Sequence, residues 1–128
     1  MGKMITIIRA ALLALCLPTP VISEPADDLV TTFATCTGRF SALMEHQWLM
    51  GDARADATQR QRARMETLLF SIMPQDRARQ TLARRIEAKF ALSTLLTRAS
   101  FNRDKRDAAR ATNRMEVQIA SCNALLLG

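Results

Sequence analysis

The feature that most constrains the fold of this chain is the placement of its three cysteines. Cys16 lies in a short apolar run near the N-terminus, whereas Cys36 and Cys122 lie near the two ends of the remaining chain. If the first segment is removed on export, two cysteines stay in an oxidising compartment, where they are expected to form one disulfide. Such a bridge would fasten the beginning of a small domain to its end.

The N-terminal segment has the pattern of a cleavable secretory signal peptide. Lys3 and Arg9 supply a positive region, and an apolar run (AALLALCL) and two prolines precede a cleavage position after Ser23. An uncleaved membrane anchor is the alternative, but the run is much shorter than the ~20 residues that cross a bilayer. We therefore expect a signal peptide at 1–23, a single domain at 24–128, and a periplasmic or secreted protein.

Composition favours helices over strands in this domain. Aromatic residues make up 5% of the chain and tyrosine is missing, whereas Ala, Leu, Arg, Met, Glu and Gln, which lose little rotamer freedom in a helix, are abundant. Loss of Lys3 and Arg9 with the leader lowers the formal charge from +6 to +4. The basic excess is therefore mild.

Apolar residues recur at helical spacings in four segments. The pattern predicts helices over 27–50, over 56–73, from 74 to about 101, and from about 108 to 126. A capping box formed by Asp56 and Gln59 is expected to begin the second helix. The third helix is expected to bury Leu82, Ile86, Phe90, Leu96 and Phe101.

Short connections between these segments indicate that neighbouring helices run in opposite directions. We therefore predict an all-α, antiparallel up-down bundle of three to four helices, stapled by one disulfide. In that arrangement the first and fourth helices are neighbours, and Cys36 and Cys122 both fall on their apolar stripes. Pairing the two cysteines places Met50 near Ala108, at the far ends of both helices.

His46, Gln47 and Trp48 form a candidate binding patch near the end of the first helix. They include the only His and the only Trp of the chain. An imidazole, an amide and an indole offer charge or metal ligation, hydrogen bonds and stacking. The alternative interpretation is structural: Trp48 covers the end of the core, Gln47 satisfies backbone groups, and His46 is solvated.

The supply of ligands argues against most cofactors. One His cannot build a structural zinc site, and the sequence contains neither the Glu-x-x-His pairs of a di-iron bundle nor the Cys-x-x-Cys-His motif of covalent haem. We predict no metal site and no cofactor. Non-covalent haem or copper(I), bound by His46 and a methionine such as Met115, stays open as an alternative.

Ala34, Gly38 and Ala42 repeat every four residues on the side of the first helix opposite its apolar stripe. A solvated face would ordinarily carry Lys and Glu, so these small side chains predict the close approach of another backbone. The partner is expected to be a helix of the same chain, which would make the first helix central. A second copy of the chain, giving a homodimer, is the alternative.

Arg103, Arg106, Arg110 and Arg114 fall within about 80° of one another on the predicted fourth helix. Arginine suits contact with carboxylates and phosphates, so this stripe is a candidate surface for an acidic partner or for peripheral contact with an anionic membrane. Nucleic acid is not expected as a partner outside the cytoplasm. The structural interpretation is a solvated face whose field is diluted by interspersed acidic residues.

Residues for catalysis are scarce. The chain has no Tyr, one His, two thiols expected in a disulfide, and neither a Gly-rich phosphate loop nor a nucleophile motif. We therefore predict an exported, non-enzymatic protein with a binding or structural role and an unidentified protein partner in the cell envelope. A small-molecule, haem or copper carrier that uses the His46 end of the bundle is the alternative function.

Overall fold

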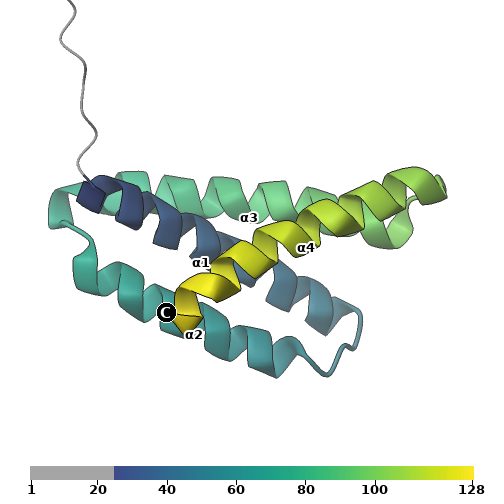
Figure 1. The fold of residues 1–128 in the computed structure, drawn as a ribbon, viewed down its shortest axis with the longest axis horizontal. Helices are drawn as coiled ribbons and strands as arrows, with labels where there is room; N and C mark the ends of the chain where they lie inside the picture. The colour runs from purple at the N-terminus through teal and green to yellow at the C-terminus, as the bar shows by residue number, and fades with distance from the viewer. Residues whose placement is uncertain (1–24) are drawn as a thin grey trace, which may run out of the picture.

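The computed structural model describes residues 25–128, so the predicted signal peptide at 1–23 lies outside the described residues. This part of the chain forms four helices and no strand (Figure 1). They are α1 (Pro25–Leu49), α2 (Ala55–Ile72), α3 (Ala78–Phe101) and α4 (Lys105–Leu127), with a single 3-10 turn, η1 (Gln75–Arg77), before α3. Cys36 and Cys122 form a disulfide. The predicted all-α fold class is confirmed, and none of the described helices is long and apolar enough to cross a membrane.

Polar side chains and turn residues set the helix boundaries. Gly51 adopts a φ of 65°, a left-handed conformation that ends α1 and that glycine adopts without steric cost. At the start of α4 the Asp104 carboxylate accepts hydrogen bonds from the backbone N–H groups of Arg106 (3.0 Å) and Asp107 (3.3 Å). This cap satisfies two donors that have no partner within the helix.

The predicted capping box at Asp56 and Gln59 is wrong. α2 begins one residue earlier, at Ala55, and its N-cap residue Arg54 makes no side-chain cap. After the turn at Gly51, the carboxylate of Asp52 accepts a hydrogen bond from the backbone N–H of Arg54 at 2.9 Å. Asp56 consequently lies inside the first turn, where its charge complements the helix dipole without capping it.

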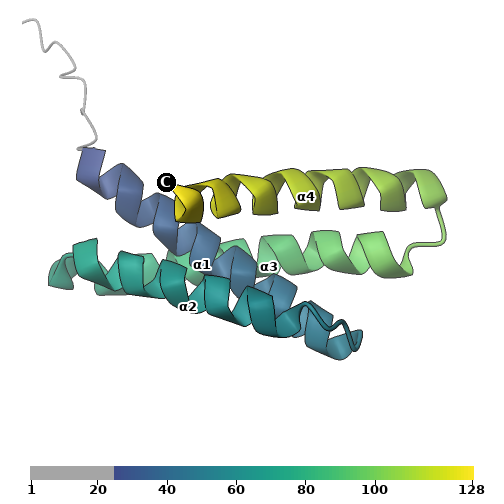
Figure 2. The same ribbon diagram turned by 60° about the horizontal axis from the view of Figure 1, so that its bottom comes forward.

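α1 is the central helix of the bundle. It packs most extensively on α3 and α2, whereas α4 packs mainly on α3 and contacts α1 over a short stretch. Figure 2 shows α3 and α4 as an antiparallel pair, and both views show α1 inclined to α4. The predicted side-by-side register of the first and fourth helices therefore holds only near the Cys36–Cys122 bridge, because α3 takes up the adjacent face of α1.

The core consists of three clusters of buried side chains, and α1 contributes to each. One surrounds the disulfide and contains Cys36, Phe40, Met65 and Cys122. A second joins α1 to α3 and α4 through Ala42, Leu92, Leu95, Leu96 and Ala111. The third joins α1 to α2 through Val30, Ala34 and Leu69. The interior is thus built outward from one helix.

The small residues of α1 allow the backbones of α1 and α3 to touch. A Cβ atom added to Gly38 would lie 2.2 Å from the carbonyl oxygen of Arg85 and 3.1 Å from Cβ of Ala88. Ala34 and Ala42 are buried on either side of this contact. The structure therefore places helices of the same chain against the Ala34–Gly38–Ala42 face.

This contact also explains why the predicted buried face of α3 is wrong. Leu82, Ile86, Phe90 and Phe101 are exposed, with 68% of the Phe90 surface accessible, and among the five predicted residues Leu96 is the one that is buried. The buried residues of α3 are Thr81, Ala88, Leu92, Leu95 and Leu96. Only a small residue fits opposite Gly38, so Ala88 turns inward, and Leu82, Ile86 and Phe90, which lie on another side of α3, turn outward.

We expect Gly38→Ala to destabilise the fold by about 3 kcal/mol, the upper end of the range for overpacking, because the opposing atom belongs to the backbone and cannot rotate away. Gly51→Ala is the control, since its Cβ meets no atom and the positive φ costs only about 1 kcal/mol. Urea denaturation of the two variants measures both values. Equal losses would contradict the close approach of α1 and α3.

The disulfide closes a loop of 86 residues. In the chain-entropy account, such a bridge stabilises the folded state by about 4 to 5 kcal/mol because it restricts the unfolded chain. We therefore expect the double variant Cys36→Ala/Cys122→Ala to lose most of this free energy of unfolding in urea denaturation. Reduced wild-type protein should behave like the double variant. Unchanged stability in both samples would disprove the stapling role.

Candidate functional site

An open pocket of about 570 Å³ lies between the C-terminal half of α1, the C-terminal half of α3, and α4. Its position follows from the arrangement of the helices. α1 and α4 are joined at Cys122 and inclined to one another, and Ile119, Ala120 and Asn123 line the end of the pocket near this junction. The crossing of the two helices therefore creates the space.

The pocket has a mixed lining of apolar and polar residues. Several of its residues belong to, or pack against, the core cluster shared by α1, α3 and α4. The apolar residues on α1, α3 and α4 are Leu43, Leu96, Ala99, Met115, Ile119 and Ala120. Apolar surface beside placed polar groups is typical of sites for small molecules.

Gln47 is the unusual residue of the lining. It lies on the apolar stripe of α1, is only 6% exposed, and its side-chain oxygen Oε1 is buried with no hydrogen-bond partner among the described residues. Its backbone carbonyl accepts the N–H of Asp52 at 2.8 Å, so the turn after α1 fixes its position. A buried acceptor without a donor costs about 1 to 3 kcal/mol, which makes Oε1 a strong candidate for contact with a ligand.

His46 lines the same pocket and connects α1 to the end of α3. Its Nε2 lies 2.9 Å from the hydroxyl oxygen of Ser100, and its ring meets the ring of Phe101 edge to face at 6.2 Å. Ser100 also belongs to the lining. These two contacts hold the imidazole in one orientation beside Gln47.

Charged groups on the lining come from the turn after α1 and from α4. Arg54 donates from Nε and from a terminal nitrogen to the carboxylate of Asp52, at 3.0 and 2.5 Å. These hydrogen bonds, together with the one from the backbone N–H of Arg54, lower the pKa of Asp52 from 3.8 to about 2, so its carboxylate stays ionised well below neutral pH. Glu116 of α4 adds a further carboxylate that is exposed to solvent.

The structure separates the members of the predicted binding patch. His46 and Gln47 share the pocket, whereas Trp48 is 50% exposed and lies outside the lining. Met50 and Met115 line the pocket together with His46. Within residues 25–128, His, Cys, Asp and Glu do not form any group of three that could hold a metal ion. The pocket therefore brings together the residues considered for a small-molecule or copper(I) site, apart from Trp48.

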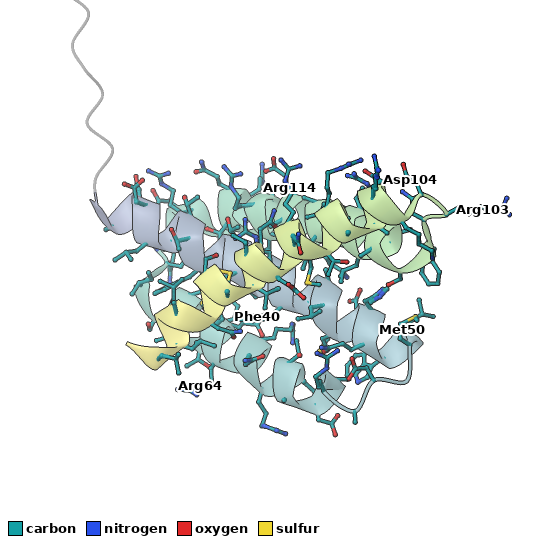
Figure 3. All side chains as sticks on the ribbon, turned by 45° about the vertical axis from the view of Figure 1, so that its right-hand side comes forward. Phe40, Met50, Arg64, Arg103, Asp104 and Arg114 are labelled. Carbon is teal, nitrogen blue, oxygen red and sulfur yellow. A yellow bond between two sulfur atoms is a disulfide. The ribbon has the colours of Figure 1, made fainter. Side chains whose placement is uncertain are left out.

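The predicted arginine stripe faces solvent. Arg106, Arg110 and Arg114 are exposed on α4, while Arg103 lies in the connection before that helix and extends outward in Figure 3. Of the nearby carboxylates, that of Asp107 binds mainly Arg98, at 2.6 Å, with Arg110 more distant at 3.4 Å. The surface is thus basic and accessible, and it lies apart from the pocket lining.

Sequence reasoning missed several residues of the pocket, among them Ser100, Glu116 and Asn123. They come from two helices whose relative placement no local pattern reveals. Thr112 could have been recognised from the sequence, because it is a polar residue next to the apolar stripe that includes Met115 and Ile119. Polar residues at core-facing positions are a recognisable mark of a lined cavity.

The chain matches no protein-family model, no curated protein and no solved structure. No relative therefore supplies a substrate, a partner or a catalytic set. A helical bundle as such is compatible with many functions, so the chemistry of the pocket is the more specific feature.

Arg54→Ala is expected to raise the pKa of Asp52 from about 2 toward 3.8, because the side-chain hydrogen bonds from Arg54 are the largest cause of the depression. An NMR titration of the Asp52 carboxyl carbon measures this value. Arg60→Ala, which removes an exposed arginine of α2, should leave the titration unchanged. An identical midpoint in wild type and Arg54→Ala would show that the pair does not form.

Proposed function

We propose that this protein is an exported, non-enzymatic binding protein that takes a small molecule in the pocket between α1, α3 and α4. The molecule has an apolar body, which lies against Leu43, Leu96 and Ile119, and a hydrogen-bond donor, which meets Oε1 of Gln47. The observation that carries the proposal is that Gln47, whose Oε1 is buried and has no hydrogen-bond partner among the described residues, belongs to the lining of an open pocket.

The size and lining of the pocket support a small ligand. Sites for small molecules have volumes of about 300 to 1,000 Å³ and a few placed polar groups among apolar ones. The volume of about 570 Å³ lies within this range. A donor on the ligand would supply the hydrogen bond that Gln47 lacks. Binding would then remove the free-energy cost of the unsatisfied acceptor, and this gain would add to the affinity.

The pair formed by His46 and Ser100 raises the question of hydrolysis, because its 2.9 Å distance suits a base and a nucleophile. Ser100 lies in the last turn of α3, where backbone N–H groups are used within the helix, as in the bond from Asn102 to the carbonyl of Arg98. An oxyanion hole needs such groups to be available. The surroundings therefore favour binding over catalysis.

The disulfide supports an exported setting, because bridges of this kind persist in oxidising compartments. Such a setting matches the secretory pattern of the first 23 residues. A protein that binds a small molecule outside the cytosol acts as a carrier, a scavenger or a sensor, and each of these roles needs the same occupied pocket.

The test uses 1-octanol and its isomer heptyl methyl ether, which has no donor. Titration of the oxidised protein, followed by ¹H–¹⁵N NMR, should show 1-octanol shifting the side-chain amide of Gln47, with weaker binding of the ether. Gln47→Met should reduce the affinity for 1-octanol about fivefold, because it removes one hydrogen bond. Gln59→Met, at an exposed position of α2, should leave the affinity unchanged.

Stability provides a second readout. Replacing an unsatisfied buried amide by an apolar group of similar shape should leave the empty protein as stable as wild type, or stabilise it by about 1 kcal/mol. Loss of affinity together with retained stability supports a binding role for Gln47. Loss of stability in Gln47→Met, or binding of 1-octanol that ignores this substitution, would count against the proposal.

A further inference from the structure

The charges on the pocket lining do not balance. Asp52, Arg54 and Glu116 are its three charged residues, and Arg54 donates to both carboxylate oxygens of Asp52. Glu116 takes part in none of the ion pairs found within residues 25–128. The lining therefore carries one surplus negative charge on a chain whose formal net charge is +6.

The helix around Glu116 supplies no cation to offset this charge. Side chains three or four residues apart are neighbours on a helix surface. At those distances from Glu116 stand Thr112, Asn113, Ile119 and Ala120, all of which are uncharged. The carboxylate is therefore available to a positively charged group that enters the pocket.

Two uncharged polar groups of the lining offer acceptors to a ligand. Oε1 of Gln47 has no donor, and the hydroxyl of Thr112 donates to the carbonyl of Ala108 at 3.0 Å, which leaves its oxygen lone pairs for a ligand. Oδ1 of Asn123 already accepts from Gln61, at 2.8 Å. A ligand thus finds acceptors to satisfy and one carboxylate to neutralise.

We infer that the molecule taken by this pocket is an amphiphilic amine: an aliphatic body that ends in a protonated primary or secondary amine. The ammonium group donates to Oε1 of Gln47 and faces the carboxylate of Glu116, while the aliphatic body covers the apolar lining. An anionic ligand is disfavoured, because the cation of the lining, Arg54, is held by Asp52. This inference rests on the pocket function proposed above and adds the charge of the ligand.

Four probes with the same eight-carbon chain separate charge from hydrogen bonding. Octylammonium has both, octyltrimethylammonium has charge without a donor, 1-octanol has a donor without charge, and octanoate has the opposite charge. NMR titrations of the oxidised protein should rank octylammonium first. Its affinity should exceed that of 1-octanol by about two- to fivefold, as expected for a solvent-exposed ion pair, and octanoate should bind more weakly than 1-octanol.

Substitutions then assign the two contacts. Glu116→Gln should reduce the advantage of octylammonium over 1-octanol, whereas Glu87→Gln, an exposed glutamate of α3 outside this pocket, should preserve it in full. Gln47→Met should weaken octylammonium at least about tenfold, because a hydrogen bond from a charged donor is stronger than a neutral one. It should affect octyltrimethylammonium far less, since that cation has no N–H to donate.

The outcomes distinguish this inference from the function on which it rests. If 1-octanol binds as tightly as octylammonium, or if Glu116→Gln changes nothing, the ligand is not an amine and the pocket function stands. If octanoate binds best, the sign of the charge is wrong. If none of the four probes shifts the pocket signals, both the inference and the proposed function are wrong.

Discussion

The contact between the backbones of α1 and α3 at Gly38 determines most of the architecture. Because the Arg85 carbonyl occupies the place of a side chain, α3 lies directly on α1 and turns Ala88 inward at this point. α4 follows α3 as its antiparallel partner and meets α1 over a short stretch that includes the disulfide. The inclination between α1 and α4 then leaves the pocket open. A glycine in the middle of a helix thus determines where the pocket opens.

The sequence predicted the helices well, but it predicted less well which side of each helix packs against its neighbours. The four helices follow from local patterns, because apolar spacing and turn residues act within a few positions, and the Cys36–Cys122 bridge follows from the number of cysteines outside the first segment. The buried face of α3 did not follow. Hydrophobic periodicity favoured Leu82, Ile86 and Phe90, whereas steric fit to α1 favoured Ala88. The close approach of the α1 and α3 backbones at Gly38 therefore had more influence on which side of α3 is buried than the size of the α3 side chains.

The candidate site shows the same division. His46 and Gln47 were recognisable as unusual residues on or beside an apolar stripe, and the structure places both in the pocket. Glu116 and Ser100 were not recognisable, since their importance depends on how α3 and α4 meet α1. A polar side chain at a core-facing position, as at Gln47, is a conflict between local chemistry and global fold, and such conflicts concentrate at functional sites. Oε1 of Gln47, which has no hydrogen-bond partner among the described residues, is therefore the most informative single atom of this site.

The bridge between Cys36 and Cys122 turns the chain from the middle of α1 to the last turns of α4 into a covalent ring. The turns that join the four helices all belong to this ring. A protease that cleaves one of them cuts the ring open but releases no piece, because the sulfur–sulfur bond still connects both sides of the cut. A protein built in this way can be nicked in a harsh environment and still remain one molecule until a reductant reaches its sulfurs.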